Sequence, residues 1–368
     1  MMGSRLAMAL IGLAVGCNTE DRQEVVSSRV VALITIDTWR LDHFSETHTS
    51  NLWQLAVEGE RFANAWSPIG LTSPAHATMF TGLMPWEHGM EGNNHHGYVL
   101  NESVPVLADR FAGFRTGAFV SAWPAGPDGG LGRGWQTFSG PASGERSGEI
   151  AVSEALEWLE TGGDSLLWVH LYEPHGPYQG DGDSDEERYA EEVRRADLYL
   201  APLLSALVER NATIVVAGDH GEVHREEKCG WQHERSISEV VLRVPMFRWT
   251  PSRLGQVREG WVGLSDVPLL LSGEDPPSRS HWLAESGMCE EGCSAGCAPA
   301  GLIGRDRVVF GPEGRHVIRP GKGAWTEGVV SPQLMELARS IPATQAPTQP
   351  ADASSLEALG YQEGVGSQ

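Results

Sequence analysis

The sequence is poor in positive charge, in cysteine and in long apolar segments. It holds 27 Lys and Arg against 49 Asp and Glu among 368 residues, a formal net charge of −22. Because such a chain repels a phosphate backbone, we expect no nucleic acid among its partners. No internal stretch reaches the roughly 18 apolar residues that a membrane-spanning helix needs, so we expect no interior transmembrane helix. A chain of this length accommodates one large α/β domain and a smaller appendage.

Five cysteines are present, and four of them follow the N-terminal region: Cys229, Cys289, Cys293 and Cys297. In an oxidising compartment this even number allows two disulfide bonds, although the pairing does not follow from the sequence. A zinc site at the last three cysteines is the alternative, which their x3 spacings and such a compartment make the weaker interpretation.

The first 17 residues are typical of an export signal. A single positive charge precedes the ten apolar residues Leu6–Val15, which are too few to span a bilayer. The small residue before Cys17 resembles a bacterial lipoprotein cleavage site, although Ala14 stands where leucine is usual. A plain secretory signal or an uncleaved anchor is the alternative. We predict a lipoprotein-type signal over 1–17 and a tether over 18–28, with the protein anchored through Cys17 on the periplasmic side of a bacterial membrane.

Three apolar, β-branched runs end in residues that bind metals or oxyanions. VVALITI (30–36) precedes Asp37, LLWVHLY (166–172) precedes Glu173-Pro174-His175, and ATIVVAG (212–218) precedes Asp219-His220. Runs without polar alternation are typical of strands buried on both faces, as in a parallel sheet. In open α/β sheets the ligand lies beyond the carboxyl ends of such strands. The convergence of acidic and imidazole side chains there suggests a metal-dependent hydrolase.

Helical segments alternate with these runs. We expect helices over Ser50–Glu58, Leu107–Ala112, Ser153–Glu160 and Glu186–Val208, and a further strand over Arg115–Ser121. Ser50 is expected to cap the first helix, and Leu198, Leu203, Leu204 and Leu207 to face the core from the last. The alternation predicts an α/β fold with a doubly wound, mostly parallel sheet flanked by helices and right-handed crossovers.

The composition changes from about Ser272 onward. Pro, Gly, Ser and Cys dominate residues 276–300, which we interpret as an irregular, disulfide-braced insertion. Arg307–Arg319 has two β-rich runs around a central turn and predicts a hairpin. We therefore predict a catalytic domain over 29–275 and a small β-rich C-terminal subdomain with a loose tail over 301–368.

A hydroxyl-rich segment, TSPAHAT (72–78), lies in the sequence between Asp37 and Glu173-Pro174-His175. Pro74 suits the first turn of a helix, and Thr72 or Ser73 suits the cap before it. A hydroxyl there faces free backbone N–H groups, a setting that binds anions. Helix capping alone would also explain Thr72 or Asp37, and a polar turn alone would explain Asp219-His220. Together they indicate a metal site, whose oxygen ligands and single imidazole suit Mg²⁺, Mn²⁺, Ca²⁺ or Zn²⁺ without choosing among them.

Six segments, in their order, resemble the sulfatase-like branch of the alkaline phosphatase superfamily. They are ITIDTWRLDHF (34–44), LTSPAHATMFTGLMPWEHGM (71–90), GLGRGWQTF (130–138), VHLYEPHGPY (169–178), VVAGDHGE (215–222) and EVVLRVP (239–245). SLEALGY (355–361) resembles a tail of many bacterial members. The resemblance implies the αβα sandwich of that superfamily and hydrolysis of phosphate- or sulfate-type esters.

The resemblance also implies site residues, position by position. Asp37, Asp219 and His220 match the metal ligands of the family. Thr72 matches its nucleophile, which would also touch the metal. Arg40 and Asp42 are expected to form a structural pair near this site.

Three further positions match residues around the substrate. Asn93 matches an asparagine that holds the non-bridging oxygens, and His175 matches a histidine that lines the substrate site. His233 falls near a His or Lys that contacts substrate or a second metal. An ordinary loop or turn position would also explain each of the three.

The chain departs from true sulfatases in ways that affect the chemistry. Sulfatases oxidise a Cys or Ser to formylglycine, whereas the same oxidation of Thr72 would give a ketone. Thr38 replaces a second acidic ligand, and His76 replaces an arginine. The chain therefore resembles threonine-dependent members such as phosphodiesterases, phosphonate hydrolases and phosphoglycerol transferases. Glu173-x-His175 lacks the D-x3-H spacing of two-zinc enzymes, which favours one divalent metal; a second at His175 and His233 is the alternative.

We predict hydrolysis of phosphate-type esters through a covalent threonyl intermediate, in preference to sulfate esters. The expected substrate is an anionic ester, either a small molecule or a glycan or lipid headgroup. A transferase that passes the same intermediate to an alcohol, and an inactive envelope lipoprotein, are the alternatives.

Overall fold

The computed structural model describes residues 28–224, 233–234, 236–253 and 255–286, the strand segments 307–311, 314–319 and 323–326, and residue 336. The predicted signal, nearly all of the tether, the five cysteines and the C-terminal tail motif lie outside the described residues.

Eight strands form one mixed sheet in the order β4-β3-β5-β1-β6-β7-β2-β8. Their bounds are β1 Val30–Ile36, β2 Glu60–Trp66, β3 Arg115–Val120, β4 Thr137–Ser139, β5 Ser165–Leu171, β6 Thr213–Gly218, β7 Met246–Trp249 and β8 Gln256–Gly263. The five strands from β4 to β6 pair in parallel, β7 is antiparallel to both its neighbours, and β2 pairs in parallel with β8. The predicted α/β class with a mostly parallel sheet is confirmed. Every residue of β1 is buried, as expected for a central strand without polar alternation.

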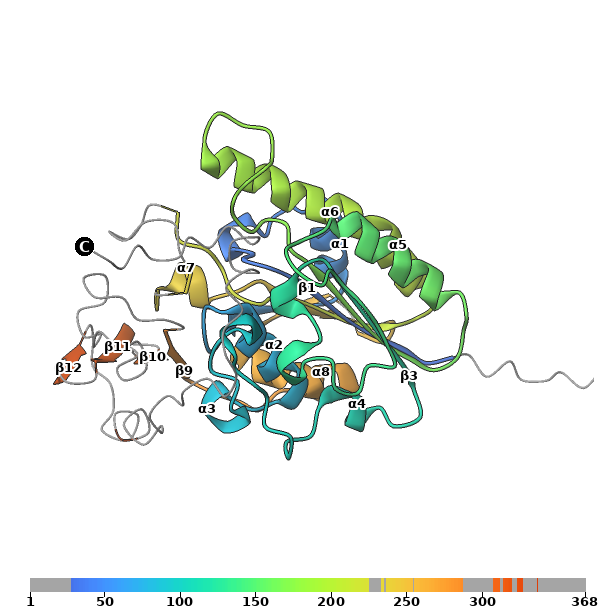
Figure 1. Cartoon of the computed structure of the whole chain (residues 1–368). Helices are drawn as coiled ribbons and strands as arrows, with labels where there is room; N and C mark the ends of the chain where they lie inside the picture. The colour runs from blue at the N-terminus through green and yellow to red at the C-terminus, as the bar shows by residue number, and fades with distance from the viewer. Residues whose placement is uncertain are drawn as a thin grey trace, which may run out of the picture.

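Helices cover both faces of this sheet (Figure 1). α1 (Ser50–Glu58), α5 (Gly148–Leu159) and α6 (Asp185–Glu209) pack on one face. α2 (Thr72–Thr81), α4 (Leu107–Arg110) and α8 (Val267–Ser272) pack on the other. The short α3 (Pro85–His88) and α7 (Glu239–Leu242) and the single-turn helices η1 (Leu41–His43), η2 (Asn94–His96), η3 (Trp123–Ala125), η4 (Asp128–Gly130) and η5 (Leu264–Asp266) complete the connections. Each face thus buries its own hydrophobic core, with the sheet between them.

Several predicted details of the helices were wrong. Ser50 is the first residue of α1 and does not cap it, because Asp197 of α6 accepts the N–H groups of Asn51 (3.1 Å) and Leu52 (2.9 Å). Leu198 is 65% exposed, since it lies on the opposite side of α6 from the buried stripe that includes Leu200 and Leu203.

The start of α5 was also predicted wrongly. It begins at Gly148, five residues earlier than expected, because the side chain of Ser147 accepts the N–H of Glu149 at 3.2 Å. The short helix predicted over Leu107–Ala112 ends at Arg110, where α4 stops.

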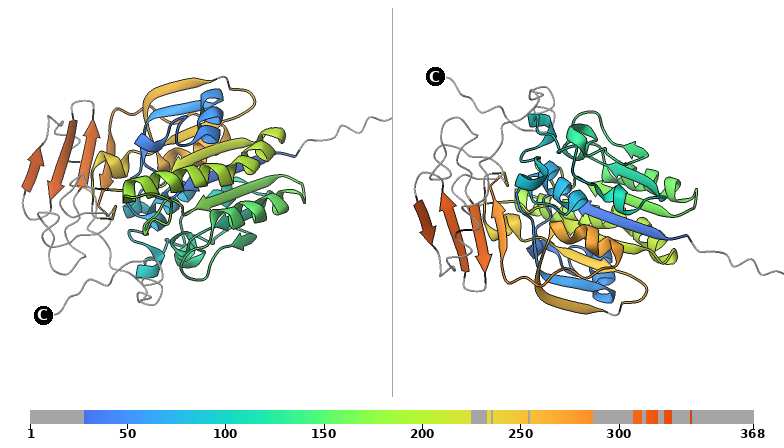
Figure 2. Two further views of the ribbon diagram at one scale, coloured as in Figure 1. Left: turned by 90° about the horizontal axis from the view of Figure 1, so that it is seen from above. Right: turned by 90° about the horizontal axis from the view of Figure 1, so that it is seen from below.

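A second, antiparallel sheet stands at the end of the molecule opposite the start of β1 (Figure 2). Its order is β12-β11-β10-β9, with β9 Trp282–Glu285, β10 Arg307–Gly311, β11 Gly314–Arg319 and β12 Gly323–Thr326. The predicted hairpin is β10 and β11. β9 falls within the segment expected to be irregular; it pairs with β10, and Trp282 donates to the carbonyl of Ser67 at 3.0 Å. Within the described part of the chain, no helix is long and apolar enough to cross a membrane.

Candidate metal and nucleophile site

The carboxyl ends of β1 and β6 bring three metal-ligating side chains together. Asp37 follows β1, and Asp219 and His220 follow β6, the neighbouring strand. All three are fully buried, and one ligand atom from each lies within 4.8 Å of the others. Thr72, the first residue of α2, donates its hydroxyl to Asp37 Oδ2 at 3.3 Å. The structure therefore gathers all four residues that the sequence proposed for metal and nucleophile.

The chemistry of this group fits a divalent metal ion. Asp37 Oδ1, Asp219 Oδ2 and His220 Nε2 are buried and have no hydrogen-bond partner among the described residues. Burial raises the pKa of Asp37 to about 7 and that of Asp219 to about 8, and it lowers the pKa of His220 to about 4. Buried polar atoms without partners are destabilising, and one cation would satisfy all three. Two carboxylates with one imidazole do not select a particular metal.

Neither His175 nor His233 belongs to this three-residue group. The number of metal ions therefore stays a prediction from the sequence.

The backbone beside Asp37 adopts a strained conformation that serves the site. Thr38 has φ +47°, in the left-handed region that β-branched residues rarely occupy. In this conformation its N–H donates to Asp219 Oδ1 at 3.2 Å, and its carbonyl accepts the hydroxyl of Tyr189 at 2.8 Å. The backbone of Thr38 thereby helps to hold Asp219 in place.

Arg40 and Asp42 form the expected ion pair. Arg40 Nη2 lies 2.6 Å from Asp42 Oδ2, and Arg40 Nη1 also donates to the carbonyl of Glu222 at 3.0 Å. The pair therefore connects the segments that follow β1 and β6.

Asn93 lies against the first turn of α2. Its Oδ1 accepts the N–H of Ser73 at 3.0 Å, so its Nδ2 points the other way and has no partner among the described residues. The helix N-cap position is Leu71, so the expectation that Thr72 or Ser73 caps α2 was wrong. Their hydroxyls donate elsewhere, that of Ser73 to the carbonyl of Pro124 at 2.6 Å.

Two further histidines approach the metal group from the side of Glu222. The His233 ring stacks on that of His220 with centroids 4.4 Å apart, and His233 Nδ1 lies 3.1 Å from Glu222 Oε2. The His175 ring is 5.2 Å from that of His233. Burial lowers the pKa of both His175 and His233 to about 3, so both are neutral near pH 7. Glu222 was missed as a site residue, although it stands two positions after His220 in the quoted motif.

A buried chain of side chains beneath Asp37 was also missed. The Thr35 hydroxyl oxygen lies 2.9 Å from His170 Nδ1 and 2.9 Å from His76 Nε2. His76 Nδ1 lies 2.8 Å from the carbonyl oxygen of Thr72, and His170 Nε2 lies 3.4 Å from Asp37 Oδ2. A histidine inside the apolar run LLWVHLY was the available signal.

The family model for sulfatases matches residues 29–268, more than half of the chain. The chain belongs to the sulfatase family, and it is an ester hydrolase.

Solved structures of related fold support the same architecture. A phosphonate monoester hydrolase from Silicibacter pomeroyi is 16% identical with a TM-score of 0.63, over 85% of this chain and 93% of that one. A sulfatase of glycosaminoglycan metabolism from Bacteroides thetaiotaomicron is 13% identical with a TM-score of 0.65, over 85% and 94%. An alkaline phosphatase superfamily protein from Vibrio parahaemolyticus is 14% identical with a TM-score of 0.61, over 90% and 86%. At these identities the likeness is one of fold.

Proposed function

We propose that the protein hydrolyses phosphate-type esters, including phosphonate esters, through a covalent intermediate on Thr72. The observation that carries this proposal is the position of the Thr72 hydroxyl, 3.3 Å from Asp37 Oδ2 beside three unsatisfied ligand atoms. Asp37, Asp219, His220 and Thr72 would hold one divalent ion. Such an ion neutralises charge on the ester and lowers the pKa of a bound hydroxyl. Because a threonine cannot become formylglycine, phosphate-type esters are favoured over sulfate esters.

The surrounding side chains supply the remaining functions. Pro74 has no N–H and the Ser73 N–H is bound to Asn93, so the Asn93 Nδ2 group is the available donor for a non-bridging oxygen. The sequence suggested an anion-binding setting formed by free backbone N–H groups at the start of this helix, and the Ser73 N–H is not free to provide it. His175 or His233, on the side of Glu222, assists the leaving group. Water then attacks the threonyl ester from the vacated side.

The test is a panel of aryl phosphate monoesters, phosphate diesters, phosphonate esters and sulfate esters, each assayed with Mn²⁺, Mg²⁺, Ca²⁺ and Zn²⁺. Wild type should cleave a phosphorus ester, Thr72→Ala should be inactive though folded, and Thr72→Ser should retain activity. Full activity of Thr72→Ala, or a preference for the sulfate ester, would overturn the mechanism. Adding alcohols to the assay separates hydrolysis from transfer, because a transferase yields a new ester.

We propose export and lipid anchoring at Cys17, on the basis of the sequence pattern. Mass spectrometry of the N-terminal peptide from a bacterial membrane fraction tests this, since an unmodified peptide that begins before Cys17 contradicts it.

A further inference from the structure

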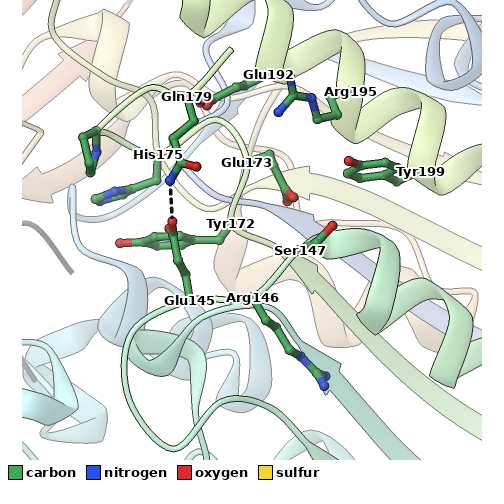
Figure 3. A pocket seen from close by; sticks show the side chains of 11 residues that line it. Glu145, Arg146, Ser147, Tyr172, Glu173, His175, Gln179, Glu192, Arg195 and Tyr199 are labelled. Atoms are coloured by element: carbon green, nitrogen blue, oxygen red, sulfur yellow. Dashed lines mark hydrogen bonds between the residues drawn. The ribbon is translucent and has the colours of Figure 1, made fainter. Parts of the chain in front are cut away.

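A cavity of about 290 Å³ lies beside His175, next to the α5 and α6 helices (Figure 3). Its lining includes Tyr172 and His175, whose rings stack with centroids 4.3 Å apart. His175 also faces His233, and His233 stacks on the candidate metal ligand His220. The cavity therefore adjoins the metal site through His175 and His233, on the side where His175 would contact a leaving group.

The charged side chains around this cavity are not balanced. Three carboxylates line it, those of Glu145, Glu173 and Glu192, together with the guanidinium groups of Arg146 and Arg195. Arg146 is already engaged, because it donates to the carbonyls of Val120 (2.9 Å) and Ser139 (3.1 Å) and pairs with Glu154 (3.0 Å). Among the described residues that line the cavity, Arg195 is thus the remaining cation for three carboxylates.

Two of these carboxylates are incompletely satisfied. Glu192 is only 5% exposed; its Oε1 accepts the N–H of Gln179 at 2.5 Å, while its Oε2 has no partner among the described residues. Glu173 Oε1 accepts the N–H of Gly148 at 2.9 Å, and its Oε2 likewise has no partner in that part of the chain. Burial raises the pKa of Glu192 to about 7, and it raises the pKa of Glu173 above its usual range. Burial is the largest cause of both shifts because it disfavours the ionised carboxylate, and a cationic partner in the cavity would favour that form.

We propose that this cavity binds an ammonium group carried by the alcohol portion of the ester substrate. The proposal rests on the proposed function for the placement of the ester, with the leaving group running past His175. An ammonium group brings a positive charge and hydrogen-bond donors to the three carboxylates. The aromatic faces of Tyr172 and Tyr199 add a surface that favours cations. A neutral polyol would donate hydrogen bonds but would leave the excess negative charge in place.

The experiment compares two leaving groups of similar size, 4-(aminomethyl)phenyl and 4-(hydroxymethyl)phenyl, in the ester class that the panel identifies. Wild type should prefer the aminomethyl ester in kcat/KM by about tenfold, the range of one charge-assisted hydrogen bond. Glu192→Gln and the more exposed Glu145→Gln should reduce this preference, and Arg195→Gln should increase it. Glu149→Gln, the same change at an exposed position at the start of α5, is the matched control and should leave the preference unchanged.

A binding measurement separates this inference from the proposed function. Calorimetry with 4-(aminomethyl)phenol and 4-(hydroxymethyl)phenol measures how tightly the cavity binds each phenol, whether or not the protein cleaves any ester. Ammonium-selective binding that Glu145→Gln weakens, in a protein that cleaves no ester, would leave the cavity assignment standing and remove the proposed function. Equal binding of the two phenols, or a preference that Glu145→Gln and Glu192→Gln do not alter, would overturn the assignment.

Discussion

His170 Nε2 lies 3.4 Å from Asp37 Oδ2, and both residues are fully buried. This contact is the longest of four in a chain that runs from Asp37 through His170, Thr35 and His76 to the carbonyl of Thr72; the other three measure 2.8–2.9 Å. Two neutral imidazoles and one hydroxyl supply three hydrogens for these four contacts. Burial lowers the pKa of both histidines, so the neutral forms prevail.

The contact that lacks a hydrogen is the longest one, between His170 Nε2 and Asp37 Oδ2. The Thr72 carbonyl can only accept, so His76 carries its hydrogen on Nδ1 and Thr35 donates to His76 Nε2. Trp168 donates to Thr35 at 3.0 Å, and His170 Nδ1 donates to the same oxygen. His170 Nε2 therefore carries no hydrogen, and its lone pair faces the carboxylate of Asp37 in the metal group. We infer that His170 is a positioning residue for a cation bound at Asp37.

We therefore predict that His170→Asn weakens metal binding by about 10- to 100-fold, the range for groups that support a metal ligand. Calorimetric titration of the metal-free protein with Mn²⁺ or Zn²⁺ measures the change. His88→Asn is the matched control, because His88 is also fully buried but its ring contacts Thr78 and the backbone of Pro74 rather than Asp37. An equal loss of affinity in both variants would show a structural role only.

Asn93→Asp should lower kcat by at least about 10²- to 10³-fold, the loss expected for one oxyanion donor, and should also raise KM because the new carboxylate repels the anionic ester. Aspartate keeps the oxygen that accepts the Ser73 N–H, so the first turn of α2 stays in place, but it lacks the Nδ2 donor. Steady-state kinetics on the best ester of the panel gives the two constants. Asn101→Asp, an exposed position that also uses its Oδ1 to accept an N–H, should not change either constant. Wild-type kinetics in Asn93→Asp would exclude the proposed donor.

The stabilisation by metal should grow as the pH rises from about 5 to 8. Asp37 and Asp219 have folded-state pKa values of about 7 and about 8, above their ordinary value of 3.8. In the metal-free protein each of these carboxyl groups binds its proton more tightly in the folded state than in the unfolded state. The resulting stability is present below pH 3.8 and is lost as the pH rises through about 7 for Asp37 and about 8 for Asp219. A metal needs both carboxylates ionised, and it is then bound by the native state alone.

Melting temperatures with added Mn²⁺ and with EDTA, measured at several pH values, give the metal-induced shift directly. EDTA should also remove activity at every pH. A shift that stays constant or shrinks toward pH 8 would argue against these carboxylates as the ligands.

A buried ion pair far from the metal group should affect the free energy of unfolding but not the activity. Glu60 and Arg248 are both fully buried, with Arg248 Nε 2.9 Å from Glu60 Oε2, and Arg258 also contacts Glu60. Glu60→Gln removes the buried carboxylate of this pair and leaves Arg248 with the half-exposed Asp275, 3.0 Å away, so it should lower the free energy of unfolding by about 3–5 kcal/mol. Urea denaturation measures this, with the exposed Glu259→Gln as control. Activity at 20 °C should be unchanged; a loss of kcat in folded Glu60→Gln would connect this pair to the site.

Much of the fold could be read from local patterns. β1 coincides with the apolar run VVALITI, and β5 and β6 lie within a residue of theirs, because strands buried on both faces must be continuously apolar. β7 was not predicted, and its antiparallel direction depends on the path of the chain between strands, which a run of four residues does not encode. Ser50 was misjudged for a related reason: the groups that cap α1 come from Asp197, 146 residues away from Asn51.

The sequence by itself determined the class of the protein and the residues on which its chemistry depends. Asp37, Thr72, Asp219 and His220 were identifiable because each stands where a strand ends or a helix begins, and because their order matches a family pattern. Only the tertiary structure decided what surrounds them. The imidazole chain of His76 and His170, the contact of Glu222 with His233, and the carboxylates beside His175 join residues from separate strands and helices. Hydrogen bonds and charge balance act across space, so such contacts become visible only when the chain has folded.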